Sequence, residues 1–400
     1  MSRSYWVLLC CVWLALAMGP ARGQDSAPEL FTKAQTAIDN RQFTTALAHL
    51  NECLRKDPFY TEAYFWRGQM RQRSADRAGA ITDYNIFLES HPQHAEALFA
   101  RANARLEEGH YALARDDFKR LMHLSSSETN TVFFQVAPHE GTKQMVTAQS
   151  ALRAVVYGSL GLIDLHTKNY PRAVAYLDSA LALQPNTDYL LNQALALHYG
   201  GQSAKALAVY ERVLQAEPRN ALAKHNLAQL TKQYGTARQA ENLLTQAIDD
   251  NPKLPFAYAE RAFLRLNNND LAGALNDYNQ AIVLDNQEPD YFVNRGIVLE
   301  KMKRYPEAIR NYDQAIKIRN TYSLAWLNRG NAHVKLNRIK EALDDYSVAI
   351  AFAPDYGLAF LNRAVAYEKM KRPVEACRDA KKAETLGMTV SESFKKAVCR

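Results

Sequence analysis

The sequence is short of cysteine and lacks the common signatures of catalysis. Only five cysteines occur in 400 residues, and two of them, Cys10 and Cys11, fall in an apolar run at the N-terminus. Beyond that run there is no HExxH, GxSxG, CxxC or glycine-rich phosphate loop. The sequence therefore disfavours an enzyme, and it predicts neither a metal site nor a cofactor.

Blocks of like charge and further long apolar runs are also missing. The 49 Lys and Arg and 42 Asp and Glu residues give a net charge of +7, and the two signs are mixed along the chain. A mixed pattern of this kind disfavours a nucleic-acid surface. No later segment is long and apolar enough to cross a bilayer. We expect a protein or peptide partner, no nucleic acid and no transmembrane segment in the mature chain, and leave self-association open.

The N-terminal run has the pattern of a secretory signal. Arg3 precedes an uncharged stretch from Tyr5 to Met18, and Ala21 and Gly23 supply the small residues that a signal peptidase reads. We expect residues 1–23 to be removed and the mature protein to be secreted or periplasmic, without a decision between the two. An uncleaved membrane anchor is the alternative.

A period of about 34 residues governs most of the remaining chain, a length typical of repeat architectures. Two series of small residues repeat at this spacing, Ala194, Ala228, Ala262, Gly296 and Gly330, and Ala206, Ala240, Ala274, Ala308 and Ala342. Each repeat contains two segments with apolar residues at helical spacing, separated by a polar turn. A fixed period of this size predicts stacked helical hairpins, none of which can bury its apolar face alone.

The repeats resemble the tetratricopeptide repeat (TPR) family. In one repeat Trp326, Gly330, Ala342, Tyr346 and Pro354 stand at the places where the family has a bulky residue, two small residues, an aromatic residue and a closing proline. The resemblance covers about ten repeats. It implies an all-α fold, an α-solenoid superhelix of helix-turn-helix repeats with a C-terminal capping helix.

One insert interrupts the period. We place repeats 1–3 at residues 27–128, the insert at 129–153, repeats 4–5 at 154–220, repeats 6–10 at 221–390 and the capping helix at 391–400. Within the insert, residues 131–136 and 143–147 are β-prone and flank a Pro/Gly segment, which predicts either a small β-hairpin or a loop. The insert either contacts a partner or only restores the register of the stack.

Arginine precedes the small residue in six repeats, and in five of these an aspartate follows at one fixed spacing, just under half a period later. This spacing predicts structural ion pairs between the two helices of a hairpin. A basic stripe for nucleic acid or phosphate is the alternative, which the matched acids disfavour. Partly exposed pairs are worth about 0.5–1 kcal/mol each. The pairs are Arg67–Asp83, Arg101–Asp117, Arg261–Asp277, Arg329–Asp345 and Arg363–Asp379, and Arg295 faces Asn311 in the sixth repeat.

Three cysteines remain after the predicted signal. Cys53 holds a small-residue place and is expected to be a buried hydrophobe. Cys377 lies in the last helix B and Cys399 in the segment that we interpret as the cap. In an oxidising compartment a Cys377–Cys399 disulfide would fasten the cap, and two free thiols are the alternative.

The candidate binding residues come from the resemblance. In related TPR superhelices, asparagines at the sixth place of each repeat hold the backbone amides of an extended peptide, and Asn suits this because it is both donor and acceptor. The alternative is that these asparagines have only local roles. The carboxylate clamp of chaperone-binding TPR domains is absent, because the fifth place holds Phe or Leu instead of Lys. The partner-binding candidates are Asn192, Asn226, Asn294, Asn328 and Asn362, with Asn331, Phe263, Val293, Leu327, Leu361, Phe65 and Phe99 around them.

These observations predict a non-enzymatic scaffold. It would bind an extended peptide or protein segment on the concave face, in cell-envelope assembly or secretion. A periplasmic component of a polysaccharide export or synthesis machine is the first alternative. An enzyme is the second.

Overall fold

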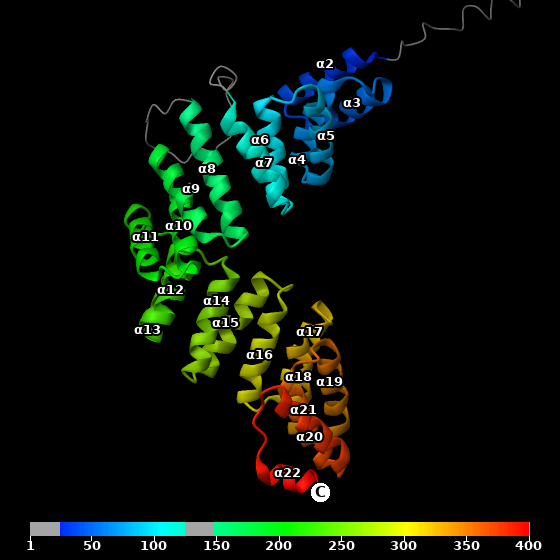
Figure 1. The fold of residues 1–400 in the computed structure, drawn as a ribbon, viewed down its shortest axis with the longest axis vertical. Coiled ribbons are helices and arrows are strands. Elements are labelled where there is room, and N and C mark those ends of the chain that lie inside the picture. The colour runs from blue at the N-terminus through cyan, green and yellow to red at the C-terminus, as the bar shows by residue number, and fades with distance from the viewer. Residues whose placement is uncertain (1–24, 125–147, 400) are drawn as a thin grey trace, which may run out of the picture. The chain divides into compact units, whose positions relative to one another are not determined.

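The computed structural model describes residues 25–124 and 148–399 and divides the chain into two compact units at Gln202 and Ser203 (Figure 1). Every element in these ranges is an α-helix, and the predicted all-α solenoid of helical hairpins is confirmed. The predicted signal peptide and the β-prone runs of the insert lie outside the described residues. No helix in the described ranges is long and apolar enough to span a bilayer.

The first unit contains four hairpins and one further helix. In each hairpin the first helix (helix A) packs against the second (helix B), and helix B packs against the next helix A. The predicted insert ends earlier than expected, since α8 already begins at Ala148. The helices are α2 (Ala27–Asp39), α3 (Phe43–Lys56), α4 (Thr61–Arg73), α5 (Arg77–Ser90), α6 (Ala95–Glu107), α7 (Tyr111–His123), α8 (Ala148–His166), α9 (Tyr170–Leu183) and α10 (Thr187–Tyr199).

The second unit begins with a helix B and ends with a short helix. The unit boundary therefore falls inside the predicted fifth repeat. The helices are α11 (Ser203–Ala216), α12 (Ala221–Tyr234), α13 (Ala237–Asp250), α14 (Pro255–Asn267), α15 (Leu271–Leu284), α16 (Pro289–Lys301), α17 (Tyr305–Ile318), α18 (Ser323–Lys335), α19 (Ile339–Phe352), α20 (Gly357–Lys369), α21 (Pro373–Thr385) and α22 (Glu392–Val398).

The periodic small residues bring the two helices of a hairpin together. Tyr346 on α19 is almost fully buried, and its ring lies over Gly330 on α18. A Cβ atom added at Gly330 would lie only 2.6 Å from Cε1 of Tyr346. The same contact joins Gly296 to Tyr312, where the distance would be 2.5 Å. A small residue at this place is thus what allows a large aromatic ring to fill the hairpin.

In most hairpins, though not in α12/α13, the turn contains one residue in the left-handed region. This residue is Gly109 in one hairpin, but it is Lys303 (φ 62°) and Asn337 (φ 59°) in two others. A side chain with a Cβ atom is strained by roughly 1–2 kcal/mol in this conformation. Asparagine tolerates it better than lysine does.

Replacing Lys303 by glycine is expected to stabilise the second unit. The relief of strain exceeds the entropic cost of glycine, which is about 0.5–1 kcal/mol, so the free energy of unfolding should rise by about 0.5–1 kcal/mol. Urea denaturation measures this change. As the control, Gln314→Gly in the interior of α17, where the side chain is also exposed, should lower stability by about 0.5–1 kcal/mol. A Lys303→Gly protein that unfolds at lower urea than wild type would contradict the expectation.

Candidate functional site

Each predicted Arg–Asp pair is present as a two-bond contact between helices A and B. Arg101 on α6 donates from Nε to Oδ2 of Asp117 at 2.9 Å and from Nη2 to Oδ1 at 2.6 Å. The other four pairs have the same pattern, with distances between 2.6 and 3.0 Å: Arg67–Asp83, Arg261–Asp277, Arg329–Asp345 and Arg363–Asp379. Two parallel charge-assisted bonds fix the guanidinium plane and hence the orientation of the two helices.

The third nitrogen of each arginine reaches back to the preceding hairpin. Nη1 of Arg101 donates to Oδ1 of Asn85 on α5 at 2.9 Å. These acceptors were not predicted from the sequence. Each stands at the same distance before its arginine as the aspartate stands after it, and they recur with the period of the repeats. They are Asn51, Asn85, Thr245, Asn279, Asp313 and Ser347. One side chain therefore joins two successive helices B through the helix A between them.

The paired carboxylates are more buried than predicted from the sequence. Asp83 and Asp277 are 0% exposed, and Asp117 is 1% exposed. In three repeats a second arginine, one turn after the first, also donates to the same carboxylate: Arg71, Arg105 and Arg265, at 2.9, 2.6 and 2.9 Å. The prediction of partly exposed pairs that contribute little to stability is wrong for these acids. A carboxylate that is buried away from water is stabilised only by its protein partners, so the loss of those partners costs far more than the loss of an exposed pair.

A further buried acid was not predicted. Asp164 on α8 is 0% exposed, accepts two bonds of 2.6 Å from Arg172 on α9, and is paired with Arg115 on α7. The period could not reveal this cluster, because the insert separates Arg115 from Asp164. The available signal was a lone acid inside the apolar stretch of residues 160–165.

The predicted asparagines lie at one place on successive helices A. Asn192 is on α10 in the first unit, and Asn226, Asn294, Asn328 and Asn362 are on α12, α16, α18 and α20 in the second. All five side chains are half-buried. Helices α16, α18 and α20 lie side by side, so the last three asparagines share one face of the second unit.

Asn362, one of these five, and the further candidate Asn331 are partly engaged within the protein. Asn362 donates from Nδ2 to Oδ1 of Asn331 at 2.9 Å, and Tyr346 donates its hydroxyl to the same oxygen at 2.8 Å. Asn328 differs, since its Nδ2 is buried and has no acceptor among the described residues. Asn294 makes no side-chain hydrogen bond to any residue in the described ranges. Asn362 therefore has a structural role, whereas Asn294 and Asn328 can still form hydrogen bonds with a partner.

Three of the predicted apolar contacts lie in the core instead of on a binding surface. Val293 and Leu327 are each 1% exposed, and Phe65 is 6% exposed. The fifth place of the repeat is thus a packing place in these hairpins. Phe263 is 38% exposed and is available to a partner. Leu361 and Phe99 are half-buried.

A pocket of about 400 Å³ opens on the face that carries Asn294. Asn294 on α16 and Phe263 on α14 line it, together with the hydroxyl-bearing ring of Tyr278, which comes from α15. The Tyr278 hydroxyl is buried and lacks a hydrogen-bond partner among the described residues. Burial also raises the pKa of Tyr291, a further lining residue, to about 12. The pocket thus offers neutral polar groups and one exposed aromatic ring.

The charged residues around this pocket are mainly acidic. Glu260, Glu288 and Asp290 line it, whereas Lys232 is the single cation among the lining residues. Lys232 is 3.3 Å from Glu260 and lies over the ring of Phe263 at 4.5 Å from its centroid. The remaining negative charge favours a ligand that is neutral or basic.

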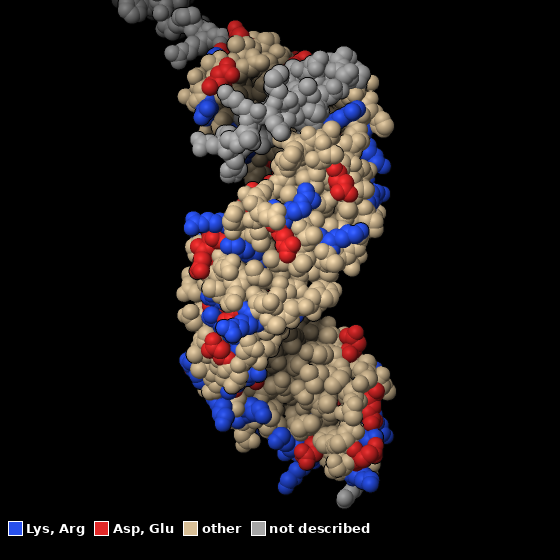
Figure 2. All heavy atoms as spheres, turned by 90° about the vertical axis from the view of Figure 1, so that its left-hand side faces the viewer, with Lys and Arg blue, Asp and Glu red and all other residues tan. Residues whose placement is uncertain are grey.

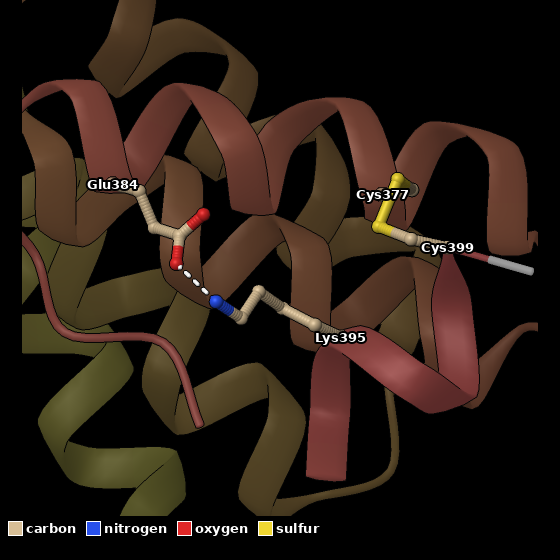
Figure 3. Close-up of a disulfide and its surroundings, with 4 residues drawn as sticks. All are labelled: Cys377, Glu384, Lys395 and Cys399. Carbon is tan, nitrogen blue, oxygen red and sulfur yellow. Dashed lines mark ion pairs between the residues drawn. A yellow bond between two sulfur atoms is a disulfide. The ribbon is translucent and has the colours of Figure 1, made fainter. Parts of the chain in front are cut away.

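The C-terminal helix is fastened to the last hairpin. A disulfide joins Cys377 on α21 to Cys399 after α22, and Lys395 forms an ion pair of 2.9 Å with Glu384 (Figure 3). Val398 is 3% exposed. Cys53, by contrast, is a buried free thiol that donates to the carbonyl oxygen of Ala27.

We examined the described residues for groups that could bind a metal ion and for surface patches of one charge. No group of three or more His, Cys, Asp or Glu side chains there is arranged to hold a metal ion. On the face drawn in Figure 2 the basic and acidic side chains are scattered among one another. The features that stand out are therefore the asparagine face and the pocket of the second unit.

Comparison with known sequences identifies the repeats. Sequence models described as "Tetratricopeptide repeat" match residues 31–71, 71–128 and 159–221, and models described as "TPR repeat" match residues 301–337 and 330–371. Together these matches cover more than half of the chain. The chain belongs to the tetratricopeptide repeat family. The matched residues include most of the hairpin α2/α3 and all of the hairpins α4/α5, α6/α7 and α18/α19.

Individual TPR relatives are distant. The chain is 19% identical over 273 residues to the "Peroxisomal targeting signal receptor" of Saccharomyces cerevisiae, covering 62% of this chain and 42% of the relative. It is 24% identical over 196 residues to "Superkiller protein 3" of Schizosaccharomyces pombe, covering 49% and 13%. The chain spans less than half the length of the curated relatives that it matches. Among solved structures, the Cut9–Hcn1 hetero-tetramer has a TM-score of 0.47 at 12% identity, with 98% and 99% of the two chains covered.

Proposed function

We propose that this chain is a non-enzymatic scaffold that binds an extended protein segment on the helix A face of its second unit, and that it serves cell-envelope assembly or secretion. Membership of the TPR family supports a protein-interaction scaffold. A relative whose name describes a receptor for a targeting signal agrees with this role. The proposed compartment rests on the signal-like residues 1–23 alone.

The observation that carries the proposal is the set of polar groups without partners on this face. Among the described residues, the Asn294 side chain, Nδ2 of Asn328 and the hydroxyl of Tyr278 have no hydrogen-bond partner, and Asn294 and Tyr278 line the same pocket. A buried polar group without a partner costs about 1–3 kcal/mol. The backbone of an extended segment offers donors and acceptors at regular spacing and would supply these missing partners.

Replacing Asn294, Asn328 and Asn362 by alanine together should reduce partner capture at least about tenfold. Each lost hydrogen bond contributes about 0.5–1.5 kcal/mol, so three of them exceed the roughly 1.4 kcal/mol that corresponds to a factor of ten. The tagged mature chain is incubated with an envelope extract, and the captured proteins are quantified by mass spectrometry.

The control is a second triple variant with equal composition. Asn242, Asn276 and Asn286 are exposed and lie outside the helices A that carry this face, so their replacement by alanine should leave capture unchanged. Thermal melts should place both variants near wild type, with a loss of about 1 kcal/mol for the Asn362–Asn331 bond. Equal recovery with both triple variants, or recovery of glycan without protein, would refute the proposal.

A further inference from the structure

The second unit contains one arginine of the repeating series that has no acid to pair with. Arg295 on α16 occupies the place of Arg101 and Arg261, but Asn311 stands where the aspartate should be. Asn311 accepts from Nε of Arg295 at 2.7 Å, and Asn279 accepts from Nη1 at 2.9 Å. Both acceptors are neutral. The guanidinium charge of Arg295 is therefore not neutralised by any residue within the described ranges.

The hydrogen bonds of Asn311 leave one donor of Arg295 unused. In the other five repeats Nη2 donates to the second carboxylate oxygen. Asn311 instead turns its Nδ2 to the carbonyl oxygen of Glu307 at 2.8 Å, and an amide nitrogen cannot accept. No acceptor among the described residues lies within hydrogen-bond distance of Nη2.

This unpaired arginine lines a pocket of about 390 Å³ between α15 and α17. Arg304 and Arg310 line the same pocket, and Glu307 is the single acid among the lining residues. Glu307 is already bound by Arg304 through bonds of 2.6 and 2.7 Å. Three cations and one acid leave the pocket with a positive charge. Burial lowers the pKa of Arg295, which agrees with a guanidinium that has lost water without gaining an anion.

The chain itself indicates which anion fits at this place. In the other five repeats a carboxylate binds the equivalent arginine, at distances between 2.6 and 3.0 Å. A carboxylate carries one negative charge. A phosphate carries nearly two and would also be attracted by the net positive charge, so the five bound carboxylates, and not the charge of the pocket, favour a carboxylate here.

We propose that the pocket lined by Arg295, Arg304 and Arg310 binds the carboxylate of an acidic side chain from a partner protein, which takes the place of the missing aspartate. The site uses α15, α16 and α17 and none of the asparagines on the helix A face. It is therefore a second, separate binding site for an anion. The proposal does not depend on the proposed peptide site, since the two sites share no residue.

The substitution Asn311→Asp tests this directly, because it supplies the carboxylate from within the chain. The probe is a triglutamate peptide blocked at both ends, and its binding to the full mature protein is measured by calorimetry at fixed salt. Blocked triglutamine and inorganic phosphate are titrated separately. Arg338→Gln is the matched control, since Arg338 is the exposed residue one period after Arg304.

Wild type and Arg338→Gln should bind triglutamate with affinities within about twofold of one another. Asn311→Asp and Arg295→Gln should each weaken binding at least about tenfold, as expected for the loss of a charge-assisted hydrogen bond. Asn311→Asp should also melt at a higher temperature than wild type, which shows that the loss does not come from unfolding. Undiminished binding by Asn311→Asp, equal binding of triglutamine, or binding of phosphate alone would overturn the proposal.

Discussion

Replacing Asp117 by asparagine is expected to lower the free energy of unfolding of the first unit by about 3–5 kcal/mol. Asp117 is 1% exposed and accepts from Arg101 and Arg105 at 2.6–2.9 Å. Without the carboxylate, two guanidinium groups whose side chains are 9% and 12% exposed would face a neutral amide. Buried charges that lose their partner cost far more than an exposed ion pair contributes.

The measurement is urea denaturation followed by circular dichroism, with Asp116→Asn as the control. Asp116 precedes Asp117 in α7 but is exposed, so its replacement should change stability by less than about 0.5 kcal/mol. Equal effects of the two substitutions would contradict the prediction.

The repeat that contains Asn311 provides a second control. There the place of Arg105 is taken by Leu299, so a single arginine faces the amide. Adding Arg105→Leu to Asp117→Asn reproduces this combination, and we expect it to recover about 1–2 kcal/mol of the loss because one unpaired charge is removed. A double variant no more stable than Asp117→Asn would show that charge is not the cause.

The regular period of the chain was sufficient to predict the hairpins and the partners of the arginines. A contact between helices A and B of one repeat joins residues at a constant separation, so Arg101 and Asp117 could be matched from spacing alone. Asn85 lies at an equal separation from Arg101 in the other direction, so its contact could also have been matched from spacing. It was missed because acceptors of several types share that place. Asn, Thr, Asp and Ser can all accept one bond from a guanidinium.

The residues of the binding face were harder to predict. The position of a residue within its repeat shows which side of the helix it occupies, but not whether its side chain remains exposed to solvent. Val293 and Leu327 stand next to predicted asparagines, and Phe65 holds the same place in an earlier repeat, yet all three are buried. Their burial depends on how successive hairpins pack, which the sequence of one hairpin does not contain. Asp164 was missed for a related reason, since its partner Arg115 lies far away in the sequence, across the insert.

Replacing Cys399 by serine is expected to destabilise the C-terminal end of the second unit by about 3 kcal/mol, the size of loss that opening a closed loop of this length produces. The disulfide joins residues with a sequence separation of 22. Helix α22 has seven residues, far fewer than an isolated helix needs to persist in water. Without the bond, α22 should detach and expose the apolar side chains that it covers around Phe360 and Val390.

Hydrogen exchange measures this change locally. Amides of α21 and α22 should lose protection in Cys399→Ser, whereas amides of α14 to α17 should exchange as in wild type. A reductant should reproduce the effect in wild type and add nothing in Cys399→Ser, because Cys53 is a free thiol in the other unit. A chain purified from an oxidising compartment with both cysteines alkylatable, or with unchanged protection in Cys399→Ser, would show that the cap is held by the contacts of Val398 and Lys395 alone.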